Sequence, residues 1–251
     1  LTKYIGEMIE DKHLTEYTDD DINDLKKLLF YRKAVFFEDQ NLTKQQLRDL
    51  GNKLKSAPDS QVYDQDLNST EEYRYGETWH SDRDYKDALP LYTALQINIL
   101  PENKLTGATE FADMVALHNF GISKSLQNML KGMTAIHEHK VKEIELSPGI
   151  FGRRVYTATH PVVLETSHDD ISVHSLFLNP AHVTKIIEFD LIESTAILKL
   201  IYEKLYDLTL KSLEKWGVKH HGLYMGKLHY DLLIDDKAMD LETAKKELVK
   251  I

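Results

Sequence analysis

Cysteine is absent from the 251 residues of this chain, and that absence excludes several kinds of chemistry. Without thiols the chain cannot form disulfides, use a thiolate nucleophile, or hold zinc through cysteine or an iron–sulfur cluster. Any metal site must therefore be built from His, Asp and Glu, and the chain has 12 His and 41 acidic residues. Ligands of this kind suit ions such as Fe(II) and Mn(II).

Arginine is scarce and long hydrophobic runs are missing. The chain has six arginines, none of them after Arg154, and a formal net charge of -10. Because non-specific binding to nucleic acid depends on Lys and Arg that neutralise phosphates, this balance argues against a nucleic-acid partner. No apolar run approaches the length of a membrane span, and the first residues lack the apolar core of a signal peptide. We therefore expect no membrane partner and a cytoplasmic location.

Linkers rich in proline or glycine, internal repeats and low-complexity tracts are also absent, with only 6 Pro and 11 Gly in the chain. Hydrophobic residues make up 42% and charged residues 29%, as is usual for a globular protein long enough to bury a core. We therefore expect a single domain over residues 1–251.

A mixture of helical and strand patterns is present. Three consecutive aspartates before an apolar periodicity, and the capping-box spacing of Thr43 and Gln46, predict two N-terminal helices. Residues 91–99 alternate, with the large apolar side chains on one face, as expected for a strand with a buried side. We interpret residues 56–72 as a loop that could cover a site, and residues 165–170 as an exposed turn. The predicted helices are 19–29, 43–54, 111–120, 125–130 and 191–213, and the predicted strands are 34–37, 91–99, 133–141, 156–164 and 172–178. Short strands interleaved with helices favour a mixed fold with a β core.

Pairs of histidine and an acidic residue two positions apart are a further feature. On a strand, residues i and i+2 project from one face, so such a pair can point at one ion. A second histidine from elsewhere would complete the facial triad that binds Fe(II) in non-haem oxygenases. The chain has three pairs: His80 with Asp82, His168 with Asp170, and His229 with Asp231. Roughly two are expected by chance in this composition, so a pair alone does not separate a metal site from a solvated or hydrogen-bonded histidine.

Four segments of the chain resemble, in order, motifs of the TauD/TfdA family, the taurine-dioxygenase-like Fe(II)/2-oxoglutarate oxygenases. They are residues 34–43 (V-F-x-D-Q-x-L-T), 79–82 (W-H-x-D), 106–114 (G-G-x-T-x-F-x-D-M), and 160–163 with 176–180 and 193–194 (H-P-V-V, L-x-V-N and E-S). No single segment is specific, but their order and spacing make the chain similar to this family.

The resemblance implies a double-stranded β-helix, or jelly roll, with flanking α-helices. It implies that His80 and Asp82 bind Fe(II), and that the hydroxyl of Thr109 holds a carboxylate of the cosubstrate 2-oxoglutarate. The implied function is a dioxygenase that uses O₂ to oxidise a C–H bond of a small, anionic organic substrate and forms succinate and CO₂. Relatives often form dimers or tetramers, so the resemblance also allows a homo-oligomer. It assigns no catalytic residue beyond the metal ligands, and the substrate-binding residues are not readable.

The C-terminal part departs from the family pattern. The W-D-N-R segment that precedes the family's distal histidine is missing after Trp216. His229, followed by a tyrosine as in some family members, is the candidate third metal ligand, and His220 and His221 are the alternatives.

The arginine that binds the far carboxylate of 2-oxoglutarate in the family is also missing. A guanidinium pairs with a carboxylate through two bonds, and lysine is not equivalent. A late lysine (Lys237, Lys245 or Lys246) could replace it, or Arg83, Arg153 or Arg154 could reach the site from elsewhere. Otherwise the chain is a catalytically degenerate scaffold, or an iron oxygenase that does not use 2-oxoglutarate.

Overall fold

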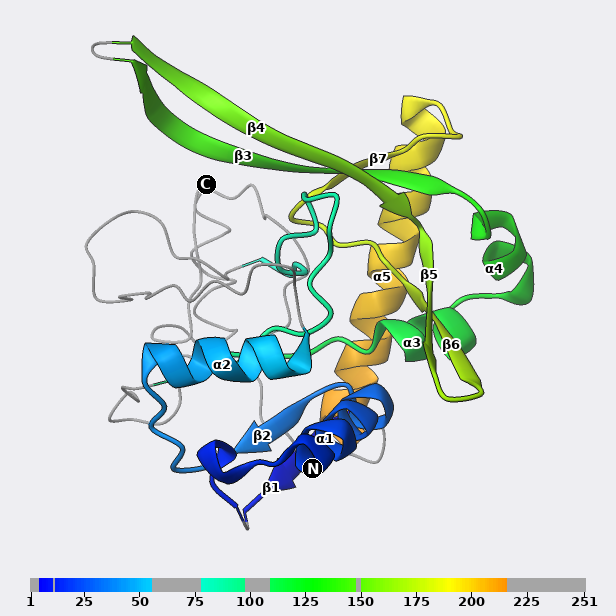
Figure 1. Cartoon of the computed structure of the whole chain (residues 1–251). Helices are drawn as coiled ribbons and strands as arrows, with labels where there is room; N and C mark the ends of the chain where they lie inside the picture. The colour runs from blue at the N-terminus through cyan, green and yellow to red at the C-terminus, as the bar shows by residue number, and fades with distance from the viewer. Residues whose placement is uncertain (1–4, 11, 56–77, 98–108, 148–149, 216–251) are drawn as a thin grey trace, which may run out of the picture.

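The computed structural model of this protein describes residues 5–10, 12–55, 78–97, 109–147 and 150–215 (Figure 1). The N-terminal part contains a small parallel sheet and two helices. Its elements are β1 (Glu7–Ile9), the 3-10 turn η1 (Leu14–Glu16), α1 (Asp19–Arg32), β2 (Val35–Phe37) and α2 (Lys44–Leu54), with β1 paired to β2.

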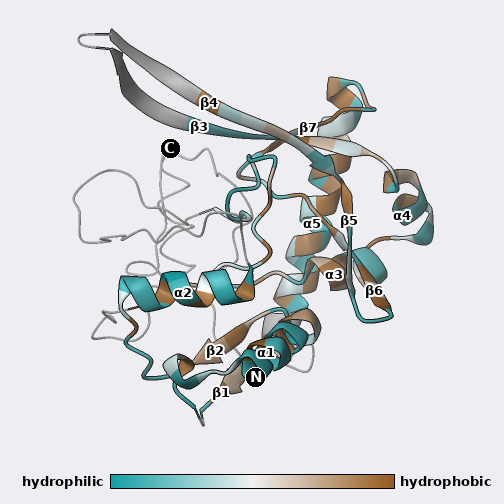
Figure 2. Ribbon diagram, viewed as in Figure 1, coloured by the Kyte–Doolittle hydropathy of each residue, from teal (hydrophilic) through white to brown (hydrophobic). Residues whose placement is uncertain are grey.

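Both N-terminal helices begin at the capping residues that the sequence predicts. Thr18 and Asp21 form a capping box at the start of α1, and Thr43 and Gln46 form one at the start of α2. Each box satisfies two backbone N–H groups that a helix start leaves without a partner. The apolar sides of the helices pack together around Tyr17, Ile22, Leu25 and Leu54, while Figure 2 shows their outward surfaces as hydrophilic.

The C-terminal part is built on a three-stranded antiparallel sheet and a hairpin. Strands β3 (Thr134–Ser147), β4 (Ile150–Pro161) and β7 (Val183–Ile186) lie in the order β4-β3-β7, and β5 (Val163–His168) pairs with β6 (Ile171–Leu176). The helices are α3 (Met114–Ala116), the π-helical turn η2 (Leu117–Gly121), α4 (Lys124–Leu130) and the long α5 (Leu191–Lys215). In Figure 1 the β3/β4 hairpin extends along one side of the molecule.

The main core lies where α5 and η2 pack against the strands. Leu117, Leu130, Val162, Ile186 and Ile201 are all fully buried there. The apolar stripe predicted for residues 191–213 supplies the α5 side of this core. No helix in the described ranges is both long and apolar enough to span a membrane.

One predicted strand is wrong. Residues 91–97 form no strand, and Leu91, Leu95 and Ile97 are exposed by 68%, 68% and 53%. Instead, the Gln96 side-chain amide donates to the Leu42 carbonyl at 2.9 Å and accepts from the Leu42 N–H at 2.8 Å. The Gln96 side chain thus makes the two hydrogen bonds that the backbone of a neighbouring strand would make. The alternating apolar residues 91–97 therefore belong to no sheet among the described residues.

The turn predicted at residues 165–170 is shorter than expected. Residues up to His168 belong to β5, and only Asp169 and Asp170 form the turn. The His168 ring packs on Phe30, with ring centroids 5.5 Å apart. The loop predicted at residues 56–72 lies outside the described residues. A mixed fold with sheets and covering helices is confirmed.

Candidate functional site

His80 lies two residues before a turn formed by residues 82–85, and Asp82 is the first residue of that turn. The Nδ1 atom of His80 lies 2.7 Å from the Thr78 carbonyl oxygen, and Nε2 lies 3.2 Å from Asp82 Oδ1. Both neighbours are acceptors, so the Nδ1–H donates to Thr78. The Nε2 atom must then carry a second proton, or a cation must lie between it and the carboxylate.

The electrostatics of the pair follow from this contact. The hydrogen bond to Asp82 is the main cause that raises the pKa of His80, while burial opposes the shift. The same bond is the main cause that lowers the pKa of Asp82. The pair therefore favours a protonated His80 ring beside an ionised Asp82 carboxylate.

The spacing of the two atoms suits a shared metal ion. Two ligand atoms that lie about 2.1 Å from one ion, at right angles to each other, are roughly 3 Å apart. The 3.2 Å between His80 Nε2 and Asp82 Oδ1 is close to this value. The strand geometry used to predict the pairing is wrong, because His80 lies in an irregular segment and Asp82 is the first residue of a turn. The turn includes Arg83 in the left-handed region at φ 58°.

Asp84 is the buried acid of the site, and the sequence interpretation missed it. Its side chain is 0% exposed and accepts three hydrogen bonds: from His137 Nδ1 at 2.8 Å, His182 Nδ1 at 2.6 Å and Asn179 Nδ2 at 2.5 Å. Burial alone would raise the pKa of Asp84, but the hydrogen bonds from these three side chains hold it well below its usual range. Asp84 is therefore a charged group with satisfied oxygens.

His182 links this buried network to the predicted ligands. Its ring lies edge-to-face with the His80 ring, at a centroid distance of 6.2 Å. With Nδ1 bonded to Asp84, the other ring nitrogen of His182 has no hydrogen-bond partner among the described residues. The sequence around Asp84 gives little indication of this network, because its hydrogen-bond partners lie 53 to 98 positions later in the chain.

Aromatic rings continue from His182 along the inner side of the β3/β4 sheet. Tyr85 stacks on His139 at 4.5 Å and meets His182 edge-on at 5.3 Å. His139 is opposite Tyr156 in the β3/β4 register, and the Lys86 ammonium lies 3.7 Å from the centre of the Tyr156 ring. These rings and one cation form a partly exposed surface beside the predicted metal ligands.

The remaining predicted site residues are not brought together with this pair in the described residues. Thr109 is described as exposed, and no contact with His80 or Asp82 is present there. His229, His220 and His221 lie outside the described residues. Within the ranges that the structure covers, no group of three His, Asp or Glu side chains is arranged to hold a metal ion.

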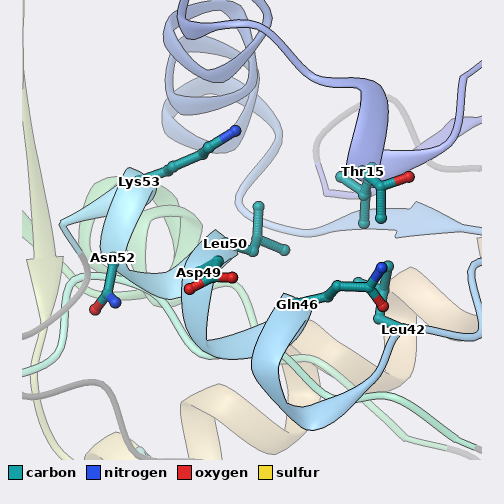
Figure 3. Close-up of a pocket in the computed structure, with 8 residues that line it drawn as sticks. Thr15, Leu42, Gln46, Asp49, Leu50, Asn52 and Lys53 are labelled. Atoms are coloured by element: carbon teal, nitrogen blue, oxygen red, sulfur yellow. The ribbon is translucent and has the colours of Figure 1, made fainter.

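An open pocket of ≈ 550 Å³ lies elsewhere in the molecule, between α2 and the η1 segment (Figure 3). Its walls include Thr15, Gln46, Leu50 and Lys53, and none of the predicted site residues. The lining also includes one carboxylate, Asp49, but no histidine and no second acidic side chain. The candidate site is therefore the His80 region and not this pocket.

Known proteins resemble this chain in sequence. A family model described as "Taurine catabolism dioxygenase TauD, TfdA family" matches residues 1–213. The chain is 32% identical over 143 residues to the "Alpha-ketoglutarate-dependent sulfonate dioxygenase" of Saccharomyces cerevisiae, a match that covers 55% of this chain. It covers 33% of the yeast protein, so the chain spans about a third of the length of this curated relative.

Solved structures also resemble it. A taurine dioxygenase from Burkholderia xenovorans has a TM-score of 0.56 and 19% identity, with 82% of this chain and 70% of that chain covered. AAD-2, solved in complex with Mn(II) and N-oxalylglycine, has a TM-score of 0.54 and 16% identity, with 82% and 77% covered. At these identities the likeness shows a shared fold alone.

Proposed function

The chain belongs to the TauD/TfdA family, since the family model matches residues 1–213 of its 251 residues, and from this membership we propose that it is a non-haem Fe(II)/2-oxoglutarate-dependent dioxygenase. Its substrate would be a small, anionic organic molecule with a C–H bond to oxidise. The named sulfonate dioxygenase among its relatives supports this substrate class. We also propose that the strands and helices complete a jelly roll in one domain over residues 1–251, as the similar solved structures support.

The environment of His80 is the observation that carries the proposal. The Thr78 carbonyl accepts a hydrogen bond from His80 Nδ1–H, and the other ring nitrogen, Nε2, lies 3.2 Å from the Asp82 carboxylate. A divalent cation at that position would accept the Nε2 lone pair and one carboxylate oxygen. Imidazole nitrogen with carboxylate oxygen is the donor set of non-haem Fe(II) sites. The side chains of His80 and Asp82 are 34% and 45% exposed, so an ion can reach them from solvent.

The residues named in this proposal each have a defined role. Thr78 fixes the tautomer and direction of the His80 ring, as outer partners of metal-bound histidines commonly do. Asp82 supplies negative charge beside the ion. We propose His229 as the third ligand and the hydroxyl of Thr109 as a donor to a 2-oxoglutarate carboxylate. Bound Fe(II), 2-oxoglutarate and O₂ would supply the oxidative decarboxylation that yields succinate and CO₂ and places one oxygen atom in the substrate.

An anaerobic titration tests the proposal. Metal-free protein is titrated with Fe(II) and then with 2-oxoglutarate, and the weak visible charge-transfer band of the chelated complex is followed. We expect the band in the wild-type chain and its loss in His80→Ala. His168→Ala is the matched control, because His168 is also two residues from an aspartate but packs on Phe30 in β5.

The outcomes separate the alternatives. Iron binding with the band supports a dioxygenase that uses 2-oxoglutarate. Iron binding without the band indicates an oxygenase with another electron source. Absence of iron binding in the wild-type chain, or equal binding by His80→Ala, would show that the proposed metal site is wrong and leave the scaffold alternative.

A further inference from the structure

We propose that Asp84 is a positioning residue that holds the metal-binding turn against the sheet and thereby sets the direction of His80 and Asp82. The inference rests on the proposed metal site, and it adds a residue outside the predicted ligand set. Asp84 does not face the ion position in this proposal; it acts through the turn and through His182.

The contacts of Asp84 join three separate parts of the chain. Its Oδ2 accepts from His137 on β3 and from Asn179, and its Oδ1 accepts from His182 just before β7. Because both oxygens are used, the carboxylate is fixed in position and in orientation. The turn that contains Asp84 is thereby attached to β3 and to the segment that leads into β7.

The attachment point is close to the predicted ligands. Asp84 is two residues after Asp82, and between them Arg83 adopts the left-handed conformation at φ 58°. A hydrogen bond from the Lys86 N–H to the Arg83 carbonyl, 3.0 Å long, closes the turn. Asp82 can therefore remain 45% exposed beside His80 while Asp84 is 0% exposed. A shift of the anchored carboxylate would move the Asp82 backbone with it.

The same network also contacts His80 through the ring of His182. Asn179 donates to Asp84 and accepts the backbone N–H of His182 at 3.0 Å, so the position of His182 is fixed twice. The His182 ring then packs edge-to-face on the His80 ring. Asp84 thus restrains one ligand through the chain and the other through a ring contact.

A buried charge with its partners is weak evidence for a role in stability alone, because desolvation offsets much of the attraction. A measurement of metal affinity distinguishes a residue that positions metal ligands from one that only stabilises the fold. Outer partners that orient metal ligands typically contribute 10- to 100-fold to affinity. A residue that only stabilises the fold would lower the melting temperature without changing the affinity of the folded protein.

The test compares Asp84→Asn with the wild-type chain and with Ser194→Ala. Ser194 is 1% exposed and accepts the Ile186 N–H at 2.8 Å, so its loss removes a buried hydrogen bond in the same core but away from the ligands. Mn(II) is titrated into each full-length chain at a temperature where circular dichroism shows it folded, and free Mn(II) is measured by its electron paramagnetic resonance signal. We expect a dissociation constant at least 10-fold higher for Asp84→Asn and an unchanged one for Ser194→Ala.

A constant for Asp84→Asn within twofold of wild type would overturn the inference. An equal loss in Ser194→Ala would overturn it too, because the effect would then be general destabilisation. If Asp84→Asn does not fold, His182→Phe removes one donor to Asp84 and keeps a ring of similar size, and the same weakening is expected. Failure of the wild-type chain to bind Mn(II) would instead reject the proposed metal site itself.

Discussion

Asn179→Asp is a sharp test of the charge state of the buried network. In the wild-type chain the Asn179 amide donates to Asp84 at 2.5 Å, and the two side chains are 5% and 0% exposed. The substitution keeps the shape but places a second carboxylate against the first. A charge-assisted hydrogen bond worth about 1.5 to 3 kcal/mol is lost, and an uncompensated buried charge brings the total to about 3 to 5 kcal/mol.

The expected loss depends on pH in a defined direction. Two adjacent carboxylates cannot both ionise freely, so the folded variant holds a proton with a pKa raised above the ordinary aspartate value. A raised folded-state pKa makes stability rise as the pH falls through that value toward the ordinary aspartate value, because the folded state then binds more protons than the unfolded state. In the wild-type chain the pKa of Asp84 is lowered, so its contribution is present above the ordinary value and is lost as the pH falls. The deficit of the variant should therefore shrink between pH 7 and pH 5.

Urea unfolding followed by circular dichroism at both pH values measures the effect. Asn179→Ala is the control, because it removes the amide donor without adding a charge and should cost about 1 to 3 kcal/mol with little pH dependence. Equal losses for the two variants at pH 7, or a deficit of Asn179→Asp that does not shrink at pH 5, would refute an ionised Asp84.

Three further predictions concern the ligand pair and the core. Because the bond to Asp82 raises the pKa of His80, a proton competes with a metal ion for Nε2. Mn(II) binding should release up to about one proton, measured by calorimetry in buffers of different ionisation heat, and should weaken as the pH falls below that pKa. Tyr202 has a buried hydroxyl without a hydrogen-bond partner among the described residues, and burial raises its pKa. Tyr202→Phe should raise the free energy of unfolding by about 1 kcal/mol, because an unsatisfied polar group is removed. A Cβ at Gly121 would lie 2.6 Å from Leu117 Cδ1, and Leu117 is 0% exposed. Gly121→Ala should therefore lower the free energy of unfolding by about 1 to 3 kcal/mol in urea.

Each of these has a contradicting result. Metal binding without proton release would mean that Nε2 of His80 carries no proton in the metal-free state. A loss of stability in Tyr202→Phe would mean that the hydroxyl has a partner in the folded chain. Unchanged stability in Gly121→Ala would mean that the Leu117 side chain can move at no cost.

Local features of the structure could be predicted from the sequence because their causes lie within a few residues. The capping boxes at Thr18 and Thr43 need only a partner three residues later, and both helices begin there. The apolar periodicity of α5 is likewise contained in the helix itself. The His80 and Asp82 contact belongs to the same class, since both side chains come from one short segment.

The strand predicted at residues 91–99 shows where such reasoning ends. An alternating pattern of apolar and polar residues indicates which side chains would share a face of a strand. A strand forms only when another strand pairs with it. In residues 91–97 the Leu42 backbone is hydrogen-bonded by a side chain, Gln96, and not by the backbone of a neighbouring strand. The partner is a property of the fold and not of the segment.

The sequence alone determined the family, the helix starts and the candidate pair His80 and Asp82. Tertiary structure alone decided that Asp84 is buried and that its partners are His137, Asn179 and His182, which follow it by 53, 95 and 98 positions. The physical reason is that a buried carboxylate is stable only where donors converge on it. Convergence over such separations is set by the pairing of β3 with β7, which no pattern around Asp84 encodes.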